Sequence, residues 1–321
     1  MTLASRGKTP DWVEAGLKYY RLNHFFQHHF GQRVWKVTLD AGFHCPNRDG
    51  TVGTAGCVFC NMEAFNPNQT WNVSLPGIAA QIDYGIDVLS RTYSARAFVA
   101  YFQPATNTYA PVEKLRKLYT EATQHPQIVG LVVGTRPDSV PEPVLELLEE
   151  LSRKTWVSLE LGLQSIHDRT LALLRRGHDF AAFLDAVERS KRHGLNVCAH
   201  VILGLPGEQP ADWLATADQL ARLNLAAVKI HNLYVPPDTE LEKWYRRGEL
   251  DLPTLEEYTG WVADFLERTP ETCVIDRISG NLPAQYLIAP EWCIDRGRVH
   301  RFLVAEFERR GTRQGSRVVG G

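Results

Sequence analysis

Three of the six cysteines lie close together in the sequence: Cys45, Cys57 and Cys60, spaced as C-x11-C-x2-C. Cysteine thiolates hold iron–sulfur clusters, commonly four to a cluster. Three ligands leave one iron open to a second molecule, as in catalytic metal sites. Zinc is the alternative, with His44 or another residue as fourth ligand, because the Cys57-x2-Cys60 pair also suits zinc. No second pair follows to complete a zinc finger, so the spacing favours an iron–sulfur centre.

The other cysteines, Cys198, Cys273 and Cys293, are spread along the chain. Cys198 stands in an apolar run, which predicts a small buried side chain in a strand. For Cys273 and Cys293 a structural role is favoured over redox activity. None of the three extends the metal-binding pattern.

The elements around the cysteines alternate between apolar strand-like runs and helix-like segments. Strands are predicted at 34–39, 97–102, 128–135, 157–163, 197–204 and 226–235. Helices are predicted at 74–93, 112–124, 141–152, 168–174, 180–193 and 212–223. This alternation indicates βαβ units with a parallel sheet. The predicted fold is α/β, a partial (β/α)6 barrel of the TIM type.

Polar or glycine residues stand at or near the ends of the predicted strands. They are Gln103, Thr135 with Arg136, Gln164, Gly204 and His231. The cysteine loop also follows a strand. In such barrels the functional residues gather where the strands end and the βα loops converge. The sequence therefore predicts one site at this face.

The segments outside the barrel divide the chain into four predicted regions. Residues 1–33 form an N-terminal extension with a helix over 12–33, and 34–235 form the barrel. Residues 236–308 pack on the barrel as a C-terminal region. Residues 309–321, rich in Arg and Gly, have the composition of a disordered tail.

Composition and charge restrict the partners. Hydrophobic residues make up 44% and charged residues 22% of 321 residues, which is typical of a globular protein. The net charge of −2 gives no overall attraction for polyanions, so RNA binding requires a local basic patch. No apolar run resembles a signal peptide or a membrane span. We therefore expect a cytoplasmic protein without a membrane partner, in which thiols stay reduced.

The segment KVTLDAGFHCPNRDGTVGTAGCVFC resembles radical S-adenosylmethionine (SAM) proteins of the YhcC/YtqA type, a branch related to the elongator catalytic subunit. The resemblance runs from about Tyr19 to Trp292 and includes YFQPATNTYA, GTRPDSV, ELGLQS, RRGHD, ILGLPGE and YLIAPEW. It implies a [4Fe–4S] cluster on Cys45, Cys57 and Cys60. The cluster would cleave bound SAM reductively to a 5′-deoxyadenosyl radical. The GGE-like segment of many radical SAM proteins is absent; YFQPATNTYA occupies its place.

The resemblance also implies which residues contact SAM. Phe59 and the backbone of Asn61 would lie near the adenine, and Gln103 and Thr135 near the methionyl part. The remaining expected contacts are Glu160, Gln164, Arg176, His200, Leu203 and His231. Simpler roles stand beside these: Phe59 and His200 as core residues, and Arg176 as a surface ion-pair residue. A buried Glu160 needs a partner, which SAM or a neighbouring arginine would supply.

For the substrate, the resemblance implies transfer RNA, with conversion of a carboxymethylaminomethyl group on the wobble uridine to aminomethyl. It also implies a low-potential electron donor such as flavodoxin or ferredoxin. Aromatic and basic residues between Lys18 and Lys36 are suited to contact RNA, or else to close the barrel base. Two alternatives stay open: a radical SAM enzyme acting on a small metabolite or protein, and a zinc-stabilised RNA-binding module.

Overall fold

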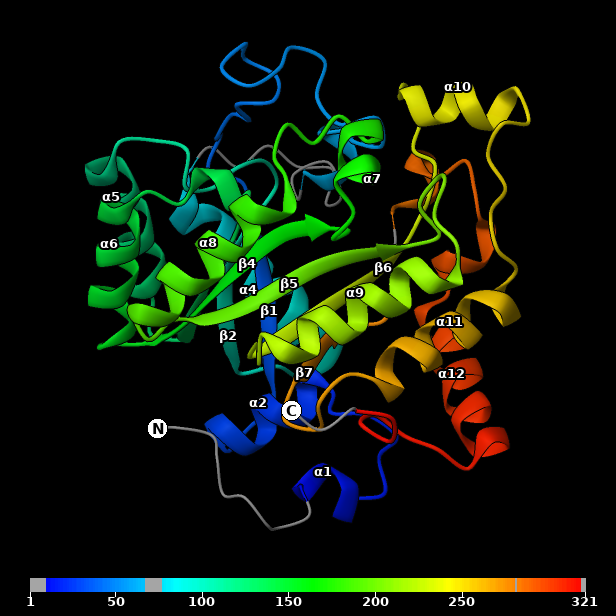
Figure 1. Ribbon diagram of the computed structural model, residues 1–321. Coiled ribbons are helices and arrows are strands. Elements are labelled where there is room, and N and C mark those ends of the chain that lie inside the picture. The colour runs from blue at the N-terminus through cyan, green and yellow to red at the C-terminus, as the bar shows by residue number, and fades with distance from the viewer. Residues whose placement is uncertain (1–9, 67–76, 281, 319–321) are drawn as a thin grey trace.

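The described part of the computed structural model, residues 10–66, 77–280 and 282–318, contains one parallel sheet of seven strands in chain order. It curls into a half-barrel (Figure 1). The strands are β1 (Val34–Leu39), β2 (Ala97–Phe102), β3 (Ile128–Thr135), β4 (Trp156–Gln164), β5 (Asn196–Leu203), β6 (Ala227–Asn232) and β7 (Val274–Arg277). Parallel strands need crossover connections, and the helices between them supply these.

Helices cover the outer face of the sheet, with a hydrophobic core between the two layers. They are α4 (Ile78–Tyr93), α5 (Val112–Thr123), α6 (Glu142–Ser152), α8 (Phe180–Arg192) and α9 (Pro210–Arg222). Each is amphipathic; α5, for example, buries Leu115 and Tyr119. The short α7 (Asp168–Leu173) follows β4. The sheet's inner face is thereby left free for a site.

The C-terminal region contributes a strand as well as helices. It contains α10 (Glu240–Arg246), α11 (Leu255–Glu267), β7, and α12 (Arg296–Arg310), which packs on α11. The sheet thus has seven strands rather than the predicted six. The extra strand, β7, is only four residues long, too short to stand out as a periodic pattern. Short 3-10 turns are η1 (Glu63–Phe65), η2 (Pro137–Ser139), η3 (Ala284–Tyr286) and η4 (Glu291–Ile294).

The N-terminal extension differs from the single helix predicted over 12–33. It forms α1 (Asp11–Glu14) and α2 (Leu22–Phe30), separated by a turn with Gly16 at φ +73°. Between them, the carbonyl of Tyr20 accepts a hydrogen bond from the Ile275 amide. Tyr19, Tyr20 and Phe26 are buried. These aromatics therefore close the barrel base instead of presenting their faces to RNA.

The end of the chain also differs from the predicted disordered tail. Arg309 and Arg310 are the last residues of α12. Gln314 is completely buried: its side chain donates to the carbonyls of Pro270 and Cys273 and accepts from the Tyr20 amide. The composition of the tail does not reveal this order, because it depends on one buried amide that pairs with backbone groups from distant segments. Residues 319–321 lie outside the described range. No helix in the described ranges is long and apolar enough to cross a membrane.

Candidate active site

The cysteine loop follows β1 and lies at the carboxyl end of the strands. Cys45, Cys57 and Cys60 line a cavity of about 200 Å³, here called the cysteine cavity. Its walls come from the ends of several strands and include Gln103, Thr135, Glu160, Gln164, Arg176 and His200. The three thiols are free, and Cys57 is buried. The loop and the strand ends therefore line the same cavity.

Two side chains donate hydrogen bonds to the sulfur of Cys57. Asn47 Nδ2 lies 3.4 Å from Cys57 Sγ, and Arg176 Nη1 lies 3.2 Å from it. Both donors stabilise negative charge on sulfur, and such bonds tune the potential of iron–sulfur clusters. Burial and the neighbouring Cys57 raise the pKa of Cys60 to about 11. Bringing the thiols together thus opposes their ionisation, and a bound cation would reverse this.

Contacts from other segments fix the loop. Arg48 Nη2 donates to the Cys60 carbonyl at 2.5 Å. The Val58 amide donates to the carbonyl of Leu174, at the end of α7, and the Val58 carbonyl accepts from the Leu241 amide in α10. The loop is therefore tied both to the barrel and to the C-terminal region.

The Arg-Pro-Asp sequence after β3 braces the same wall. Arg136 forms two hydrogen bonds with the Asp138 carboxylate, at 2.9 and 2.7 Å, and donates to the Arg176 carbonyl at 2.7 Å. Such bidentate pairs fix geometry. Thr135 is buried, and its hydroxyl lies 2.6 Å from that of Thr108. Arg136 thus pairs with a carboxylate and holds its loop.

The end of β4 is distorted where it meets the cavity. The register with β5 shifts between Gly162 and Gln164, and Gln164 has φ +76°. The backbone at Gly162 is closely approached: a Cβ there would lie 2.9 Å from Gln164 Nε2 and 3.1 Å from Arg176 Nη2. Strained backbone of this kind is often found at functional sites. At Gln164 this backbone conformation directs the side chain into the cavity.

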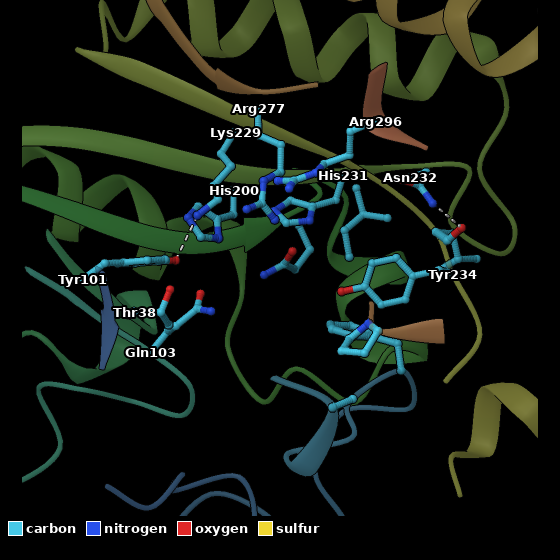
Figure 2. A pocket seen from close by; sticks show the side chains of 16 residues that line it. Thr38, Tyr101, Gln103, His200, Lys229, His231, Asn232, Tyr234, Arg277 and Arg296 are labelled. Carbon is cyan, nitrogen blue, oxygen red and sulfur yellow. Dashed lines mark hydrogen bonds between the residues drawn. The ribbon is translucent and has the colours of Figure 1, made fainter. Parts of the chain in front are cut away.

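A second cavity of about 520 Å³ adjoins the cysteine cavity (Figure 2). The two share Phe59, Tyr101, Gln103, Gln164 and His200. The residues lining only the second cavity come largely from β6, β7 and the C-terminal region. They include His231, Asn232, Tyr234, Arg277 and Arg296. Together the cavities provide adjoining spaces for two bound molecules.

A buried charge network of Lys36, Glu160, Lys229 and Asp276 lies at the inner side of these cavities. Glu160, at 1% exposure, receives Lys36 Nζ at 2.8 Å and Lys229 Nζ at 2.8 Å. Lys36 also contacts Asp276. Burial alone raises the pKa of Glu160, but Lys229 and Lys36 hold it well below its usual range. The buried carboxylate therefore has two cationic partners.

Glu160 also lies 2.7 Å from His200 Nε2. In place of the arginine partner expected from the sequence, Glu160 contacts two lysines and a histidine from β1, β5 and β6. Glu160, Cys198 and His200 form a trio close enough for a metal ion, with ligand atoms within 4.8 Å of one another. Because the lysines and His200 already occupy the Glu160 oxygens, this trio is a structural cluster.

Most of the residues predicted to contact SAM line at least one cavity. Those are Phe59, Gln103, Thr135, Glu160, Gln164, Arg176, His200 and His231. Phe59 also packs on a small core cluster around Leu174. Arg176 is buried at the Cys57 sulfur and the Gly162 carbonyl, so its surface alternative was wrong.

Leu203 and Asn61 are placed differently. Leu203 is buried in the main core outside the sheet, while Ile202 lines the second cavity. Alternation along β5 explains this, because His200 and Ile202 point to the same face and Leu203 to the other. The Asn61 side chain donates to the Pro237 carbonyl and accepts from the Ala64 amide. It holds the loop and leaves only its backbone for a ligand.

Several cavity residues had no predicted role: Thr38, Tyr101, Lys229, Tyr234, Arg277 and Arg296. A lysine inside each of the apolar runs VWKVTL and AVKIHN was an available signal, because a buried lysine requires a partner. The two arginines gave no local signal. Their place depends on how the C-terminal region packs.

Comparison with known proteins identifies the family. A model described as Radical SAM superfamily matches residues 47–220, and one described as Radical_SAM C-terminal domain matches 225–309. YtqA of Bacillus subtilis is 37% identical over 301 residues, covering 93% of this chain and 92% of YtqA. YhcC of Escherichia coli is 41% identical over 268 residues, covering 83% and 85%.

More distant similarities extend to other proteins. A tRNA uridine(34) acetyltransferase of Dehalococcoides mccartyi is 28% identical over 176 residues, covering 54% of this chain and 38% of that protein. The solved structure of Elp3 from the archaeon Methanocaldococcus infernus matches with a TM-score of 0.66 at 19% identity, covering 88% of this chain and 64% of Elp3. This likeness concerns the fold. The family model and the two bacterial relatives show that the chain belongs to the radical SAM superfamily, as an enzyme of the YhcC/YtqA type.

Proposed function

We propose that Cys45, Cys57 and Cys60 hold a [4Fe–4S] cluster and that the adjoining cavities bind SAM and a tRNA substrate. The observation that carries the proposal is the cysteine cavity, where three free thiols face the ends of the neighbouring strands. The residues fit such a cluster. Two N–H donors point at Cys57 Sγ, and Arg136 and Arg176 place positive charge beside the thiols.

A cluster bound by Cys45, Cys57 and Cys60 would supply the electron for reductive cleavage of SAM. The protein's own residues bind and orient. Thr135 and Gln103 offer polar groups for the amino acid part of SAM, and Gln164 is turned toward the shared space by its backbone. Phe59 offers an aromatic face beside them.

For the substrate, we propose the wobble uridine of tRNA, with conversion of carboxymethylaminomethyl to aminomethyl. The support is the similarity to a tRNA uridine(34) acetyltransferase over about half of this chain. The second cavity has a volume within the range of small-ligand sites and suits a nucleoside. A low-potential donor such as flavodoxin or ferredoxin would reduce the cluster in the cytoplasm.

The test compares tRNA nucleosides by mass spectrometry in the parent strain and a strain lacking the gene. We expect carboxymethylaminomethyluridine to accumulate and aminomethyl-derived uridines to fall. Restoring the gene should reverse the change, whereas a Cys57→Ala gene should not. Unchanged wobble uridine would contradict the tRNA assignment. Anaerobic purification supplies the second check: four irons per chain and SAM cleavage on reduction are expected, and zinc in their place would refute the cluster.

A further inference from the structure

We propose that Arg277 and Arg296 form a carboxylate-binding subsite, which holds the carboxylate of the substrate's reacting side chain. The subsite lies in the second cavity, on the wall made by β7 and the start of α12. In naming the group that these residues bind, the inference rests on the proposed function.

The lining of the second cavity favours an anion. Of the sixteen described residues that line it, Lys229, Arg277 and Arg296 are cationic and none is Asp or Glu. Figure 2 shows Arg277, Arg296 and His231 on the same side of the cavity. A partly enclosed space lined by charges of positive sign only attracts and holds negative groups.

Among the residues that the structure describes, the two arginines differ from the third cation, Lys229, in having no neutralising carboxylate. Lys229 is bound to Glu160 at 2.8 Å. Within the described ranges, neither Arg277 nor Arg296 has a carboxylate within 4.0 Å or a side-chain hydrogen bond. Elsewhere in the protein, Arg310 contacts three carboxylates, those of Asp264, Glu267 and Glu306. With respect to the described part of the chain, the guanidinium donors of both arginines are therefore available to a ligand.

Electrostatics around the pair point the same way. Arg296 is exposed as a residue, but partial desolvation of its guanidinium and the nearby charge of Arg277 lower its pKa. Burial and Arg277 also hold the pKa of His231 well below its usual range, which keeps this imidazole neutral. His231 Nε2 is buried and has no hydrogen-bond partner among the described residues. An anion between the guanidinium groups would relieve their repulsion, and planar guanidinium forks suit a carboxylate.

The position of the pair determines what the rest of the ligand meets. Neither arginine lines the cysteine cavity, whereas Gln164, His200 and Phe59 line both cavities. A molecule anchored at the arginines therefore extends toward the shared residues and the cysteines. Arg277 and Arg296 thus bind the carboxylate end of the substrate on the side of the second cavity that lies away from the proposed cluster. Thr135 and Arg176, which line only the cysteine cavity, remain available to contact SAM.

A terminal carboxylate fits this placement better than a backbone phosphate. Arg277 ends a strand of the barrel and is partly buried, with His231 and Lys229 also lining the cavity. The end of a side chain can enter such a space, while a phosphodiester carries a ribose on each side. We therefore assign the subsite to the carboxymethyl group of the proposed nucleoside.

The test measures binding by calorimetry to the iron-loaded enzyme with two pairs of probes. The first pair is 5-carboxymethylaminomethyluridine and 5-aminomethyluridine; the second is N-benzylglycine and benzylamine. Each pair differs only by the carboxymethyl group. We expect the wild type to prefer the carboxylated member by about 10- to 100-fold, as charge-assisted hydrogen bonds imply. Arg277→Gln and Arg296→Gln should each remove most of the preference, and Arg277→Lys should keep part of it.

Arg298→Gln is the matched control, since Arg298 stacks over Phe302 on the same helix and does not line the cavity. Its preference should stay at the wild-type value, and thermal melting checks that all variants fold. SAM affinity should not change in Arg277→Gln; a loss would assign the arginines to SAM and overturn the proposal. Equal loss of affinity for RNA stem-loops with and without the carboxymethyl group would identify a phosphate contact and overturn it too.

The benzyl pair separates this proposal from the proposed function. If the enzyme prefers N-benzylglycine in an Arg277-dependent manner but leaves tRNA unmodified, the subsite stands and the tRNA assignment fails. If tRNA is modified but the wild type shows no preference within either pair, the subsite is wrong and the function stands.

Discussion

The charge network and the second cavity adjoin inside the half-barrel, yet they handle charge in opposite ways. In the network, the Glu160 carboxylate is matched by Lys36 and Lys229 at 2.8 Å. In the cavity, Arg277 and Arg296 lack such partners among the described residues. A buried charge must be paired, whereas a partly exposed one can remain open to a ligand. The network therefore stabilises the fold of the barrel, whereas the arginines of the second cavity are available to bind a charged ligand.

The largest effect that separates the two regions should come from the cysteines. We expect Cys57→Ala to abolish iron retention and SAM cleavage, because a cluster ligand is lost. Iron analysis and 5′-deoxyadenosine release measure this. Cys198→Ala is the control, since Cys198 is buried beside the network and lines neither cavity. Full cleavage by Cys57→Ala, or loss in Cys198→Ala alone, would mean that the ligands were misassigned.

Within the network, Glu160→Gln should be the most damaging change to stability. It removes the carboxylate that Lys36 and Lys229 both contact at 2.8 Å and leaves only Asp276 to neutralise them, and breaking a buried ion pair costs about 3–5 kcal/mol. Denaturant unfolding measures the free energy of unfolding. The matched control is Glu249→Gln, an exposed partner of Arg247, which should leave stability nearly unchanged because exposed ion pairs contribute little. Comparable losses in both variants would contradict a special role for burial.

The network also predicts a pH dependence of stability. The folded pKa of Glu160 lies below its unfolded value of 4.5, so its contribution is present above pH 4.5 and is lost as pH falls through the folded pKa. For Lys36, burial lowers the pKa, but Asp276 and Glu160 raise it above 10.5. That contribution is present below pH 10.5 and is lost as pH rises through the folded pKa.

Free energies of unfolding measured from pH 2 to 11 should show both losses of stability in the wild type, one at acid pH (the acid limb) and one at alkaline pH. The acid limb should be shallower in Glu160→Gln, because the amide does not titrate. An acid limb of unchanged slope in the variant would assign the acid sensitivity to other carboxylates.

The smallest expected effect is on the potential of the cluster. Asn47→Ala removes one N–H donor from Cys57 Sγ, so the thiolate is less stabilised and the reduction potential should become more negative. Redox titration followed by electron paramagnetic resonance measures this. Thr51→Val is the control, because the Thr51 hydroxyl lies on the same loop but contacts the Tyr109 hydroxyl rather than a cysteine. A shift of the same size in both variants would point to loop disturbance instead.

Prediction from sequence succeeded where the signal was local. The alternating apolar runs gave the parallel strands, and most of the polar residues at their ends line the cavities. It failed where contacts join distant segments. The pleat of β5 turns Leu203 into the core outside the sheet, and Gln314, expected in a disordered tail, is buried against Pro270 and Cys273.

By itself the sequence determined the βα order and a loop that carries three thiols after the first strand. Both follow from short-range patterns, residue spacing and side-chain periodicity. Only the tertiary structure decided which charges meet. Lys36, Glu160 and Lys229 become partners because β1, β4 and β6 curl around one interior. Arg277 and Arg296 reach the cavity because β7 joins the sheet and α12 begins beside it. Electrostatic partnership depends on distance in space, which the linear order does not encode.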